Sequence, residues 1–476
     1  MFMKSKLKFL FTTFCVILSF IISSCTTIDS LQEAISSLFE SQNSNIQNNE
    51  TQKIKKVSST MYKIPEDYEK AYSFRTDTPH PMAKKIPTNI AKLKTSNPAE
   101  YVNKCCEFIN SNSTDDFEKV KIAHDLVALN VKYDAKNFWA ETVPPQNYEN
   151  VLKTGYAVCE GYSNLLKKFL DTLNFKNSKI SGYARGVGTS LMAENNMDSN
   201  HAWNMVKIEN AYYFIDSTWD SGYMNGKKSV QKYTTDWLFI KPEHFIFTHL
   251  PERQQQQLLK EPVSNTEFLK LADFQPKFFE VAENFVIKNG ELPQKTNHVL
   301  NSIQFEYEIK ANYYLDFSVV QTEKNKRIEN STFTQTNGNI SKTVIQFPEA
   351  GKYQIQIFYY KKTERQGLGC AEFFVNAQDG SQIRYPRIYQ NSFDAKVICP
   401  IEMPLKKGET YHFEINCPSK NFAAVICGKN FSQMQKNDDG TFSLDFTVPT
   451  NISQLNIGVS SAKTGSYQTV ATYICK

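Results

Sequence analysis

The sequence predicts an α+β fold, in which helices pack on an antiparallel sheet and two β-sandwiches follow. Apolar residues recur at helical spacing through most of residues 96–175. Residues 201–220 change to alternating aromatic and β-branched residues, which is typical of strands. From about residue 283 to the end the chain is strand-like, with frequent turn residues. Helices followed by strands indicate an α+β domain and then separate all-β domains.

The length and composition are those of a globular protein with several domains. The chain has 476 residues, which is too long for one ordinary core. It is 41% hydrophobic and 22% charged, which excludes a multi-span membrane protein and a wholly disordered chain. The net charge is only +5 and no basic stripe is present, so we expect no nucleic-acid partner.

The first residues are typical of a secretory signal peptide, which we assign to residues 1–24. Three lysines precede an apolar run from Phe9 to Ile22, and small residues follow. The run of about 14 residues is short for a transmembrane helix, which needs about 20. The tetrapeptide ISSC that ends at Cys25 resembles the lipobox of bacterial lipoproteins, in which the cysteine is lipidated. This resemblance implies a membrane-anchored lipoprotein of the cell envelope, periplasmic or at the cell surface, with lipid on Cys25. A plain signal peptide cleaved nearby is the alternative.

Composition divides the rest of the chain into a tether and three folded domains. Residues 25–60 are rich in Ser, Gln, Asn and Thr, and Phe39 is their one aromatic residue. Such a segment cannot bury enough apolar surface to fold, so we expect a flexible tether. We expect the folded domains at residues 61–282, 283–378 and 379–476.

The ten cysteines form no obvious framework of disulfides or metal ligands. If Cys15 leaves with the signal peptide, Cys25 is lipidated and Cys159 is reactive, the number that remains is odd. The best candidates for a disulfide lie in the β-patterned region and are Cys399, Cys417, Cys427 and Cys475. No CxxC pair occurs, so we expect no structural zinc site, and nothing implies a cofactor.

Cys159 begins a predicted helix. The apolar residues that follow it recur at spacings of three and one and mark one helix face: Tyr162, Leu165, Leu166, Phe169, Leu170 and Leu173. A helix N-terminus favours negative charge and therefore stabilises the thiolate, which is the nucleophilic form of cysteine. The alternative is a buried structural cysteine, since free cysteines are among the most buried residues.

His201 begins a predicted hairpin, HAWNMVKIENAYYFIDSTWD, with a two-residue Glu-Asn turn. This turn pairs Trp203 with Asp216 and His201 with Thr218. His201 and Asp216 are then diagonal neighbours on one face, with Cα atoms about 7–8 Å apart, within reach of a carboxylate–imidazole hydrogen bond. A register slip of one residue would turn Asp216 to the opposite face. Asp220 is the rival partner for His201, but it lies past the expected end of the strand.

Three runs resemble the core motifs of the transglutaminase-like superfamily: AVCEGYSNLLKKF, HAWNMVKI and FIDSTWD. That superfamily carries Cys, His and Asp in this order along the chain. PQNYENVLKTGYAVCEGY and TDWLFIKPEHFIFTHLPERQQQQLL resemble its kyphoscoliosis-peptidase branch, and so does the β-rich tail. The resemblance covers most of residues 100–476. It implies a papain-like core of helices on an antiparallel sheet, followed by two immunoglobulin-like sandwiches.

The resemblance also implies an activity. Cys159, His201 and Asp216 would be the triad of a thiol enzyme that acts on protein or peptide amide bonds through a thioester intermediate. Such an enzyme is a peptidase, a deamidase or a transglutaminase, according to what takes up the acyl group. Gln146 is a candidate for an oxyanion donor, because an upstream amide often serves this purpose in cysteine hydrolases. An ordinary polar loop residue is the alternative interpretation of Gln146.

A second hypothesis is a catalytically inactive envelope scaffold, which would bind proteins through the transglutaminase-like core and the sandwiches. Cys159, His201 and Asp216 together favour the enzyme, since a scaffold needs none of them. The two added β-domains and the tether favour a binding role. Trp203 and Trp219 flank the His and the Asp, and we expect them either to wall the site or to be core aromatics. The oligomeric state stays open.

Overall fold

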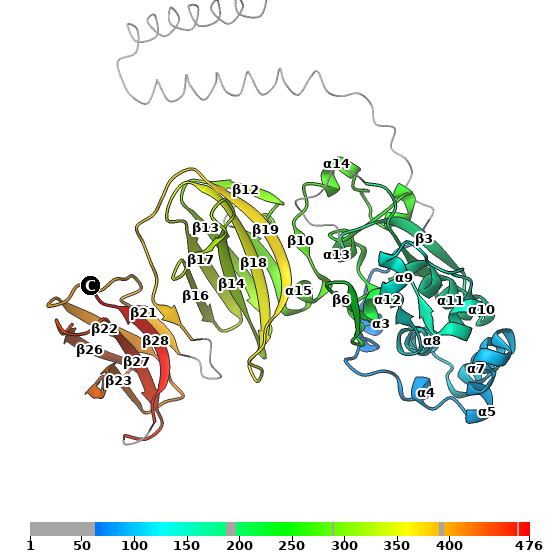
Figure 1. The fold of residues 1–476 in the computed structure, drawn as a ribbon. Coiled ribbons are helices and arrows are strands. Elements are labelled where there is room, and N and C mark those ends of the chain that lie inside the picture. The colour runs from blue at the N-terminus through cyan, green and yellow to red at the C-terminus, as the bar shows by residue number, and fades with distance from the viewer. Residues whose placement is uncertain (1–61, 187–196, 288–289, 390–394, 464–465) are drawn as a thin grey trace, which may run out of the picture. The chain divides into compact units, whose positions relative to one another are not determined.

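The computed structural model describes residues 62–186, 197–287, 290–389, 395–463 and 466–476. The predicted signal peptide (1–24), the lipidation residue Cys25 and the tether (25–60) lie outside these residues. All of the described residues belong to one compact unit, in which a helix-rich region precedes a region of strands (Figure 1). Within the described ranges, no helix is long and apolar enough to cross a membrane.

The helix-rich region extends to Val281. Its helices are α3 (Glu69–Ser73), α4 (Pro81–Lys84), α5 (Thr88–Ala91), α6 (Leu93–Ser96), α7 (Pro98–Asn112), α8 (Asp116–Asn130), α9 (Ala135–Trp139), α10 (Tyr148–Thr154), α11 (Cys159–Thr172), α12 (Ser217–Asp220), α13 (Pro242–Phe245), the 3-10 helix η1 (Gln254–Gln257), α14 (Asn265–Phe268) and α15 (Pro276–Val281). Its strands are β1 (Lys132–Tyr133), β2 (Tyr156–Ala157), β3 (Asn177–Ala184), β4 (His201–Ile208), β5 (Ala211–Ile215), β6 (Gly222–Asn225), β7 (Lys228–Gln231), β8 (Leu238–Ile240), β9 (His249–Pro251) and β10 (Asp273–Phe274).

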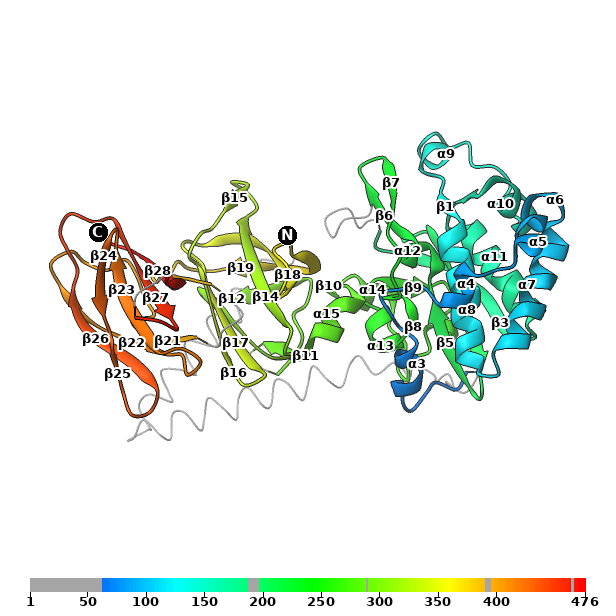
Figure 2. The ribbon, with the colours of Figure 1, turned by 90° about the horizontal axis from the view of Figure 1, so that it is seen from below.

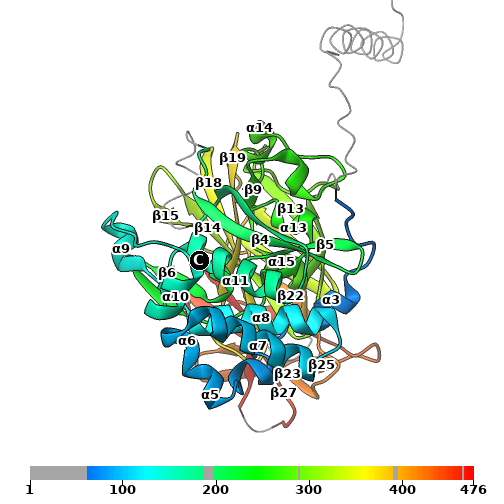
Figure 3. The ribbon, with the colours of Figure 1, turned by 90° about the vertical axis from the view of Figure 1, so that its right-hand side faces the viewer.

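An antiparallel sheet in the order β8-β5-β4-β3-β9 forms the centre of this region. Helix α11 packs on β3 and β4, and α7 and α8 pack against α11 (Figure 3). Side chains of β4 alternate between two cores: Val206 and Ile208 join the helix-side core, whereas Trp203 and Met205 join an aromatic core on the other face. The sheet is therefore covered on both faces, and the predicted core of helices on an antiparallel sheet is confirmed.

The predicted hairpin is confirmed up to its last pairs. Strands β4 and β5 pair Ile208 with Ala211 and Asn204 with Ile215, which is the register set by a two-residue turn. The pairs expected beyond them, Trp203 with Asp216 and His201 with Thr218, do not form, because β5 ends at Ile215. The next residues instead form α12, whose N-cap is Asp216. A carboxylate that caps a helix N-terminus stabilises this change of direction.

Two β-sandwiches follow, as the alternating patterns predict. In the first, β11 (Ala282–Ile287), β13 (Ser302–Ile309), β17 (Ile340–Gln346) and β16 (Thr332–Asn337) form one sheet. The facing sheet holds β10, β19 (Leu368–Ala377), β18 (Gly351–Lys361), β14 (Tyr313–Gln321) and β15 (Lys326–Arg327), and β12 (Thr296–Val299) also pairs with β19. Buried residues from both sheets form one core, as expected for sheets packed face to face.

The second sandwich has its own core. One sheet is β20 (Arg387–Ile388), β28 (Gln468–Ile474), β27 (Gln454–Ser460), β23 (Phe422–Cys427) and β24 (Asn430–Gln433). The other is β21 (Lys396–Cys399), β22 (Thr410–Asn416), β26 (Thr441–Thr447) and β25 (Gln435–Lys436).

No disulfide joins the four candidate cysteines Cys399, Cys417, Cys427 and Cys475, since all four are free thiols. Cys427 ends β23 and Cys475 follows β28, and β27 lies between these two strands. Two strand spacings amount to about 10 Å. This exceeds the Cα separation of about 4.4–6.8 Å that a disulfide bridges.

Candidate active site

Cys159 is the first residue of α11, where the helical spacing of the sequence predicts it. Its side chain is partly exposed, whereas the other described cysteines of the helix-rich region, Cys105 and Cys106, are buried. The backbone N–H groups of a first helical turn have no partner inside the helix. The thiol of Cys159 therefore lies at the positive end of the helix dipole, which stabilises negative charge there.

His201, at the start of β4, hydrogen-bonds to Asp216. The Nε2 atom of His201 lies 2.6 Å from Oδ2 of Asp216, and the two side chains are 8% and 0% exposed. Burial opposes a charge on the imidazole. The negative charges of Asp216 and Cys159, and hydrogen bonds to both, outweigh burial and raise the pKa of His201 to about 10. Since Nε2 bonds to Asp216, Nδ1 is the ring nitrogen left to face the thiol.

Every oxygen of the Asp216 carboxylate has partners. Oδ1 accepts hydrogen bonds from the backbone N–H groups of Thr218 and Trp219, at 2.9 and 3.2 Å. Oδ2 bonds His201 and also lies 3.2 Å from Nε2 of His249. Burial opposes ionisation, but the charge on His201 and these hydrogen bonds hold the pKa of Asp216 below its usual value. Asp216 is therefore a buried carboxylate with four donors around it.

His249 completes the group, and the sequence patterns did not indicate it. It begins β9, is fully buried, and its other ring nitrogen bonds the Thr248 hydroxyl at 2.9 Å. Burial lowers the pKa of His249 to about 4, despite the nearby Asp216 carboxylate, and the charge on His201 adds to this effect. A neutral His249 donates its Nε2–H to Asp216. Only the sheet order, which places β9 beside β3, brings it to the site.

Asp220, the rival partner, lies in a separate buried network. Its Oδ2 atom is 3.1 Å from Nε2 of His124, and its Oδ1 accepts from the Thr234 hydroxyl and the Trp237 N–H. His124 also bonds Asp125 at 2.8 Å through Nδ1. Asp216, the N-cap of α12, and Asp220, its last residue, thus have different partners, and Asp216 is the one that bonds His201.

The residues after Cys159 attach α11 to its surroundings. The backbone carbonyl of Ser163 accepts a 3.0 Å hydrogen bond from the side chain of Asn204 on β4. The Tyr162 hydroxyl donates to the Val131 carbonyl at 2.8 Å. A Cβ atom on Gly161 would lie 2.5 Å from Oε1 of Gln146, so only glycine allows this approach. These contacts fix the position of the Cys159 end of α11 relative to the strand that carries His201.

Gln146, the oxyanion candidate, supports the same helix start. Its Oε1 accepts from the N–H of Val158 at 2.9 Å, and its Nε2 donates to the Pro144 carbonyl at 2.8 Å. Its backbone carbonyl accepts from Asn164 at 2.9 Å. Through these hydrogen bonds Gln146 stabilises the backbone next to Cys159. The second N–H of its side-chain amide can donate to a further acceptor. The oxyanion role stays a prediction.

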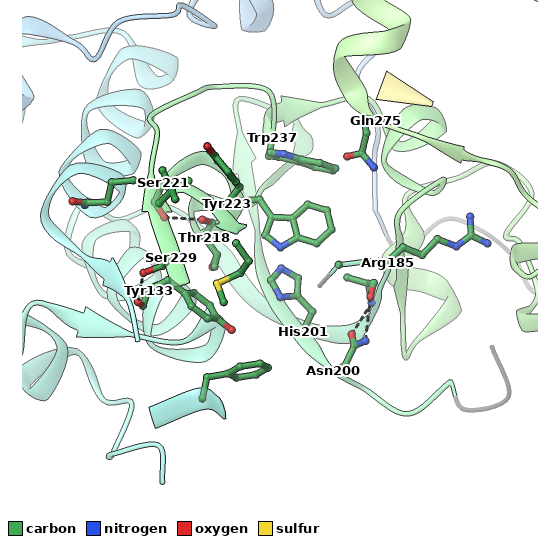
Figure 4. Close-up of a pocket in the computed structure, with 18 of the residues that line it drawn as sticks. Tyr133, Arg185, Asn200, His201, Thr218, Ser221, Tyr223, Ser229, Trp237 and Gln275 are labelled. Atoms are coloured by element: carbon green, nitrogen blue, oxygen red, sulfur yellow. Dashed lines mark hydrogen bonds between the residues drawn. The ribbon is translucent and has the colours of Figure 1, made fainter. Parts of the chain in front are cut away.

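A cleft of about 520 Å³ opens beside His201. Figure 4 shows His201 at its centre, with Tyr133 and Ser229 on one side and Arg185 and Asn200 on the other. Much of the wall is aromatic, from Phe138 and Trp139 of α9, Tyr223 of β6, and Trp219 and Trp237. Helix α9 and the β6–β7 hairpin lie side by side at its rim (Figure 2).

The two tryptophans that flank the motif residues differ in role. Trp219 lines the cleft, and its ring lies 5.3 Å from the His201 ring. Trp203 is fully buried behind His201, at 6.0 Å, and belongs to the aromatic core.

A second, more open hollow lies beside the start of α11 and is lined by residues 143–147, Glu160 and Asn164. Cys159 is the chain neighbour of Glu160, which lines this second hollow, and it hydrogen-bonds His201, which lines the cleft.

The group of His201, Asp216 and His249 also has donor atoms that a metal ion accepts, all within 4.8 Å of one another. However, the same atoms, Nε2 of each histidine and Oδ2 of Asp216, bond one another at 2.6 and 3.2 Å. This arrangement orients an imidazole and shares its proton. The geometry therefore favours acid–base chemistry at His201.

Comparison with known proteins assigns this site to a family. The family model described as "Transglutaminase-like superfamily" matches residues 103–217, which include Cys159, His201 and Asp216. Residues 103–217 thus form a transglutaminase-like domain. The chain is similar to kyphoscoliosis peptidase of Mus musculus, with 26% identity over 155 residues, and the Homo sapiens protein gives the same values. The match covers 32% of this chain and 23% of the peptidase.

Two further matches are more limited. Cytokinesis protein 3 of Schizosaccharomyces pombe is 30% identical over 101 residues, which is 21% of this chain and 11% of that protein. This chain thus spans less than a quarter of the length of these curated relatives. A crystal structure of a TGase is 20% identical and covers 31% of this chain and 36% of that chain, with a TM-score of 0.20.

Replacing Gly161 with Ala should disturb the site. The added Cβ would overlap Gln146, Ala157 and Val151, at 2.5–2.9 Å, so we expect a loss of about 1–3 kcal/mol in the free energy of unfolding. Alkylation of Cys159 by iodoacetamide at neutral pH should also slow. Urea unfolding and peptide mapping measure the two effects. Gly369→Ala is the control, since its nearest neighbour would be at 3.7 Å. Equal effects in both variants would contradict this account of Gly161.

His249 should make stability depend on pH. The unfolded residue titrates near 6.5 and the folded one at about 4, so only the unfolded state gains a proton between these values. Its contribution is present above pH 6.5 and is lost as the pH falls to 4, by about 3 kcal/mol at most. Urea unfolding between pH 7 and 4 should therefore show a shallower slope for His249→Gln, whereas His298→Gln, an exposed histidine, should match the wild type. Identical slopes for all three proteins would contradict the assignment.

Proposed function

We propose that this protein is an exported, membrane-anchored thiol enzyme that acts on protein or peptide amide bonds. The observation that carries the proposal is His201, which bonds Asp216 at 2.6 Å and also contacts Cys159 at the edge of a cleft. Hydrogen bonds then connect the nucleophile Cys159 to the base His201, and His201 to the orienting group Asp216, which is the arrangement that activates a thiol. The match of residues 103–217 to the transglutaminase-like family model also supports thiol chemistry.

In the proposed reaction the Cys159 thiol first gives its proton to Nδ1 of His201. The thiolate attacks the amide carbonyl, a C–S bond forms, and the carbonyl π electrons move to the oxygen. When the oxyanion collapses, the C–N bond breaks, and the His201 imidazolium protonates the leaving amine. A thioester on Cys159 remains. Water, deprotonated by His201, then attacks the thioester carbonyl; the C–S bond breaks, the carboxylic acid leaves, and the His201 imidazolium returns its proton to the Cys159 thiolate. In transglutamination a second amine attacks in place of water, and a new amide leaves.

Asp216 and His249 have supporting roles in this scheme. The Asp216 carboxylate holds the His201 ring through Nε2 and stabilises the imidazolium, which is consistent with the raised pKa of His201. His249 and the N–H groups of α12 hold Asp216 itself. For the oxyanion, the Cys159 backbone N–H and the remaining N–H of Gln146 are the proposed donors, each worth about 2.7–4 kcal/mol where such donors have been removed elsewhere.

The cleft beside His201 and the second hollow beside the start of α11 suggest how a polypeptide substrate would lie. The cleft of about 520 Å³ has an aromatic rim, where Phe138, Trp139 and Tyr223 are 38%, 37% and 54% exposed. Aromatic side chains at this exposure suit the apolar parts of an extended polypeptide. The more open hollow near Gln146 would hold the part of the substrate across the scissile bond. The name of the similar mouse protein, a peptidase, also supports hydrolysis.

The first test is alkylation of Cys159 by iodoacetamide as a function of pH, read by peptide mapping of the full chain. The wild type should be labelled at neutral pH, and His201→Ala should reduce the rate about tenfold or more, because the imidazole no longer accepts the thiol proton. Cys106 serves as an internal control, since burial raises the pKa of its thiol to about 12. Equal rates with and without His201 would overturn the proposal and favour the scaffold.

Asp216→Asn should slow alkylation and turnover more than Asp220→Asn does. Only Asp216 bonds His201, and an amide cannot stabilise the imidazolium, so we expect a loss of about 100-fold or more in turnover. Turnover is measured as release of amine, ammonia or a peptide fragment from casein, and as incorporation of a fluorescent amine, with Cys159→Ala as the blank. A larger loss for Asp220→Asn would contradict this assignment.

Membrane anchoring through Cys25 is a further part of the proposal, supported by the lipobox-like ISSC sequence. Cys25→Ala should move the protein from the membrane pellet to the supernatant after cell fractionation, since one lipidated residue supplies the anchor. Cys15→Ala, inside the signal peptide, is the matched control and should stay in the pellet. If Cys25→Ala also stays in the pellet, the lipid anchor is wrong, while the enzyme proposal is unaffected.

A further inference from the structure

The second sandwich carries a cluster of metal-ligating side chains far along the chain from Cys159. Cys399, His412 and Glu414 lie on neighbouring strands, and one ligand atom from each lies within 4.8 Å of the others. Nε2 of His412 is 3.9 Å from Oε2 of Glu414. We propose that these three residues form a binding site for Zn²⁺ or a similar divalent transition-metal ion.

The strand register explains why the three side chains share one face. On β22, Phe413 and Ile415 point into the core, so His412 and Glu414 lie on the outer face. Strict alternation along β21 would place Cys399 inside with Val397. A β-bulge between Val397 and Cys399 shifts the register and sets Cys399 opposite Glu414, and residues paired across two strands share a face.

His412 is oriented as a zinc ligand. Its Nδ1 atom lies 2.7 Å from Oδ1 of Asp445, its cross-strand partner on β26. A histidine that binds metal through one nitrogen commonly donates its other N–H to a carboxylate, which fixes the ring and its tautomer. Asp445 thus directs Nε2 of His412 toward Glu414 and Cys399. This is an observation independent of the closeness of the three ligands.

The chemistry and the dimensions suit zinc. Thiolate, imidazole and carboxylate are its usual ligands, at about 2.0–2.3 Å, so tetrahedral ligands lie about 3.5 Å apart. The distances between the ligand atoms of Cys399, His412 and Glu414 need to shorten by about 1 Å. Side-chain rotations of the half-exposed His412 and the partly exposed Glu414 allow this change. Binding displaces the Cys399 thiol proton to solvent. The fourth position would be open to water or to a ligand from a partner.

The absence of a CxxC pair does not exclude this site, because its ligands come from two strands joined by the bulged register. The cluster is also separate from the proposed thiol chemistry. Its test is therefore done with Cys159→Ala in every chain, so that the Cys159 thiol cannot bind the metal and enzyme activity plays no part.

The experiment is a titration of the full chain with Co²⁺ after removal of metal with EDTA. We expect one Co²⁺ per chain, a thiolate-to-cobalt charge-transfer band, and displacement by Zn²⁺. Cys399→Ser should lose the band, and His412→Gln and Glu414→Gln should raise Kd tenfold or more. Asp445→Asn should raise Kd about 10–100-fold. His298→Gln, an exposed histidine of the first sandwich, should change nothing.

Unfolding temperatures in EDTA show whether the variants fold, and Zn²⁺ should raise Tm only in chains that keep the three ligands. No saturable Co²⁺ binding, or a band that persists with unchanged Kd in Cys399→Ser, would overturn the proposal. So would a loss of binding in His298→Gln equal to that in His412→Gln.

Discussion

The structure around the candidate active site depends on the burial of one carboxylate, Asp216. A fully buried carboxylate needs donors for its oxygens, because removing it from water without them costs several kcal/mol. Two backbone N–H groups of α12 and two histidines supply them. The same side chain thus ends β5, starts α12 and orients His201. Loss of Asp216 would affect both the local backbone and the chemistry that we propose.

The other half of the site depends on close packing at the start of α11. Gly161 allows Gln146 to approach, and the Ser163 carbonyl bonds Asn204 on the strand that begins with His201. Because these contacts join helix and strand directly, the distance between Cys159 and His201 is set by the core and not by a loop. This fixed placement is what a proton transfer between the two side chains requires.

Local patterns were sufficient for much of this arrangement. The helix from Cys159 and the hairpin register follow from nearest-neighbour geometry, since a two-residue turn allows one pairing. The strand pattern was wrong beyond Ile215. Asp216 caps the helix α12 there, so the chain leaves the strand and the expected cross-strand pairs do not form. The sequence could name Cys399, Cys417, Cys427 and Cys475 only as candidates for a disulfide, because composition does not give distances between strands, and all four are free thiols.

The sequence by itself determined the α+β core, the two sandwiches and the family resemblance, and it named Cys159, His201 and Asp216 as candidates, with Asp220 as the rival of Asp216. Those features depend on periodicity and on residues close together in the chain. Only the tertiary structure decided between Asp216 and Asp220, brought His249 from β9 to the site, and set Cys399 opposite Glu414. The physical reason is that sheet order, bulges and burial act between residues distant in sequence, where no periodic pattern records the contact.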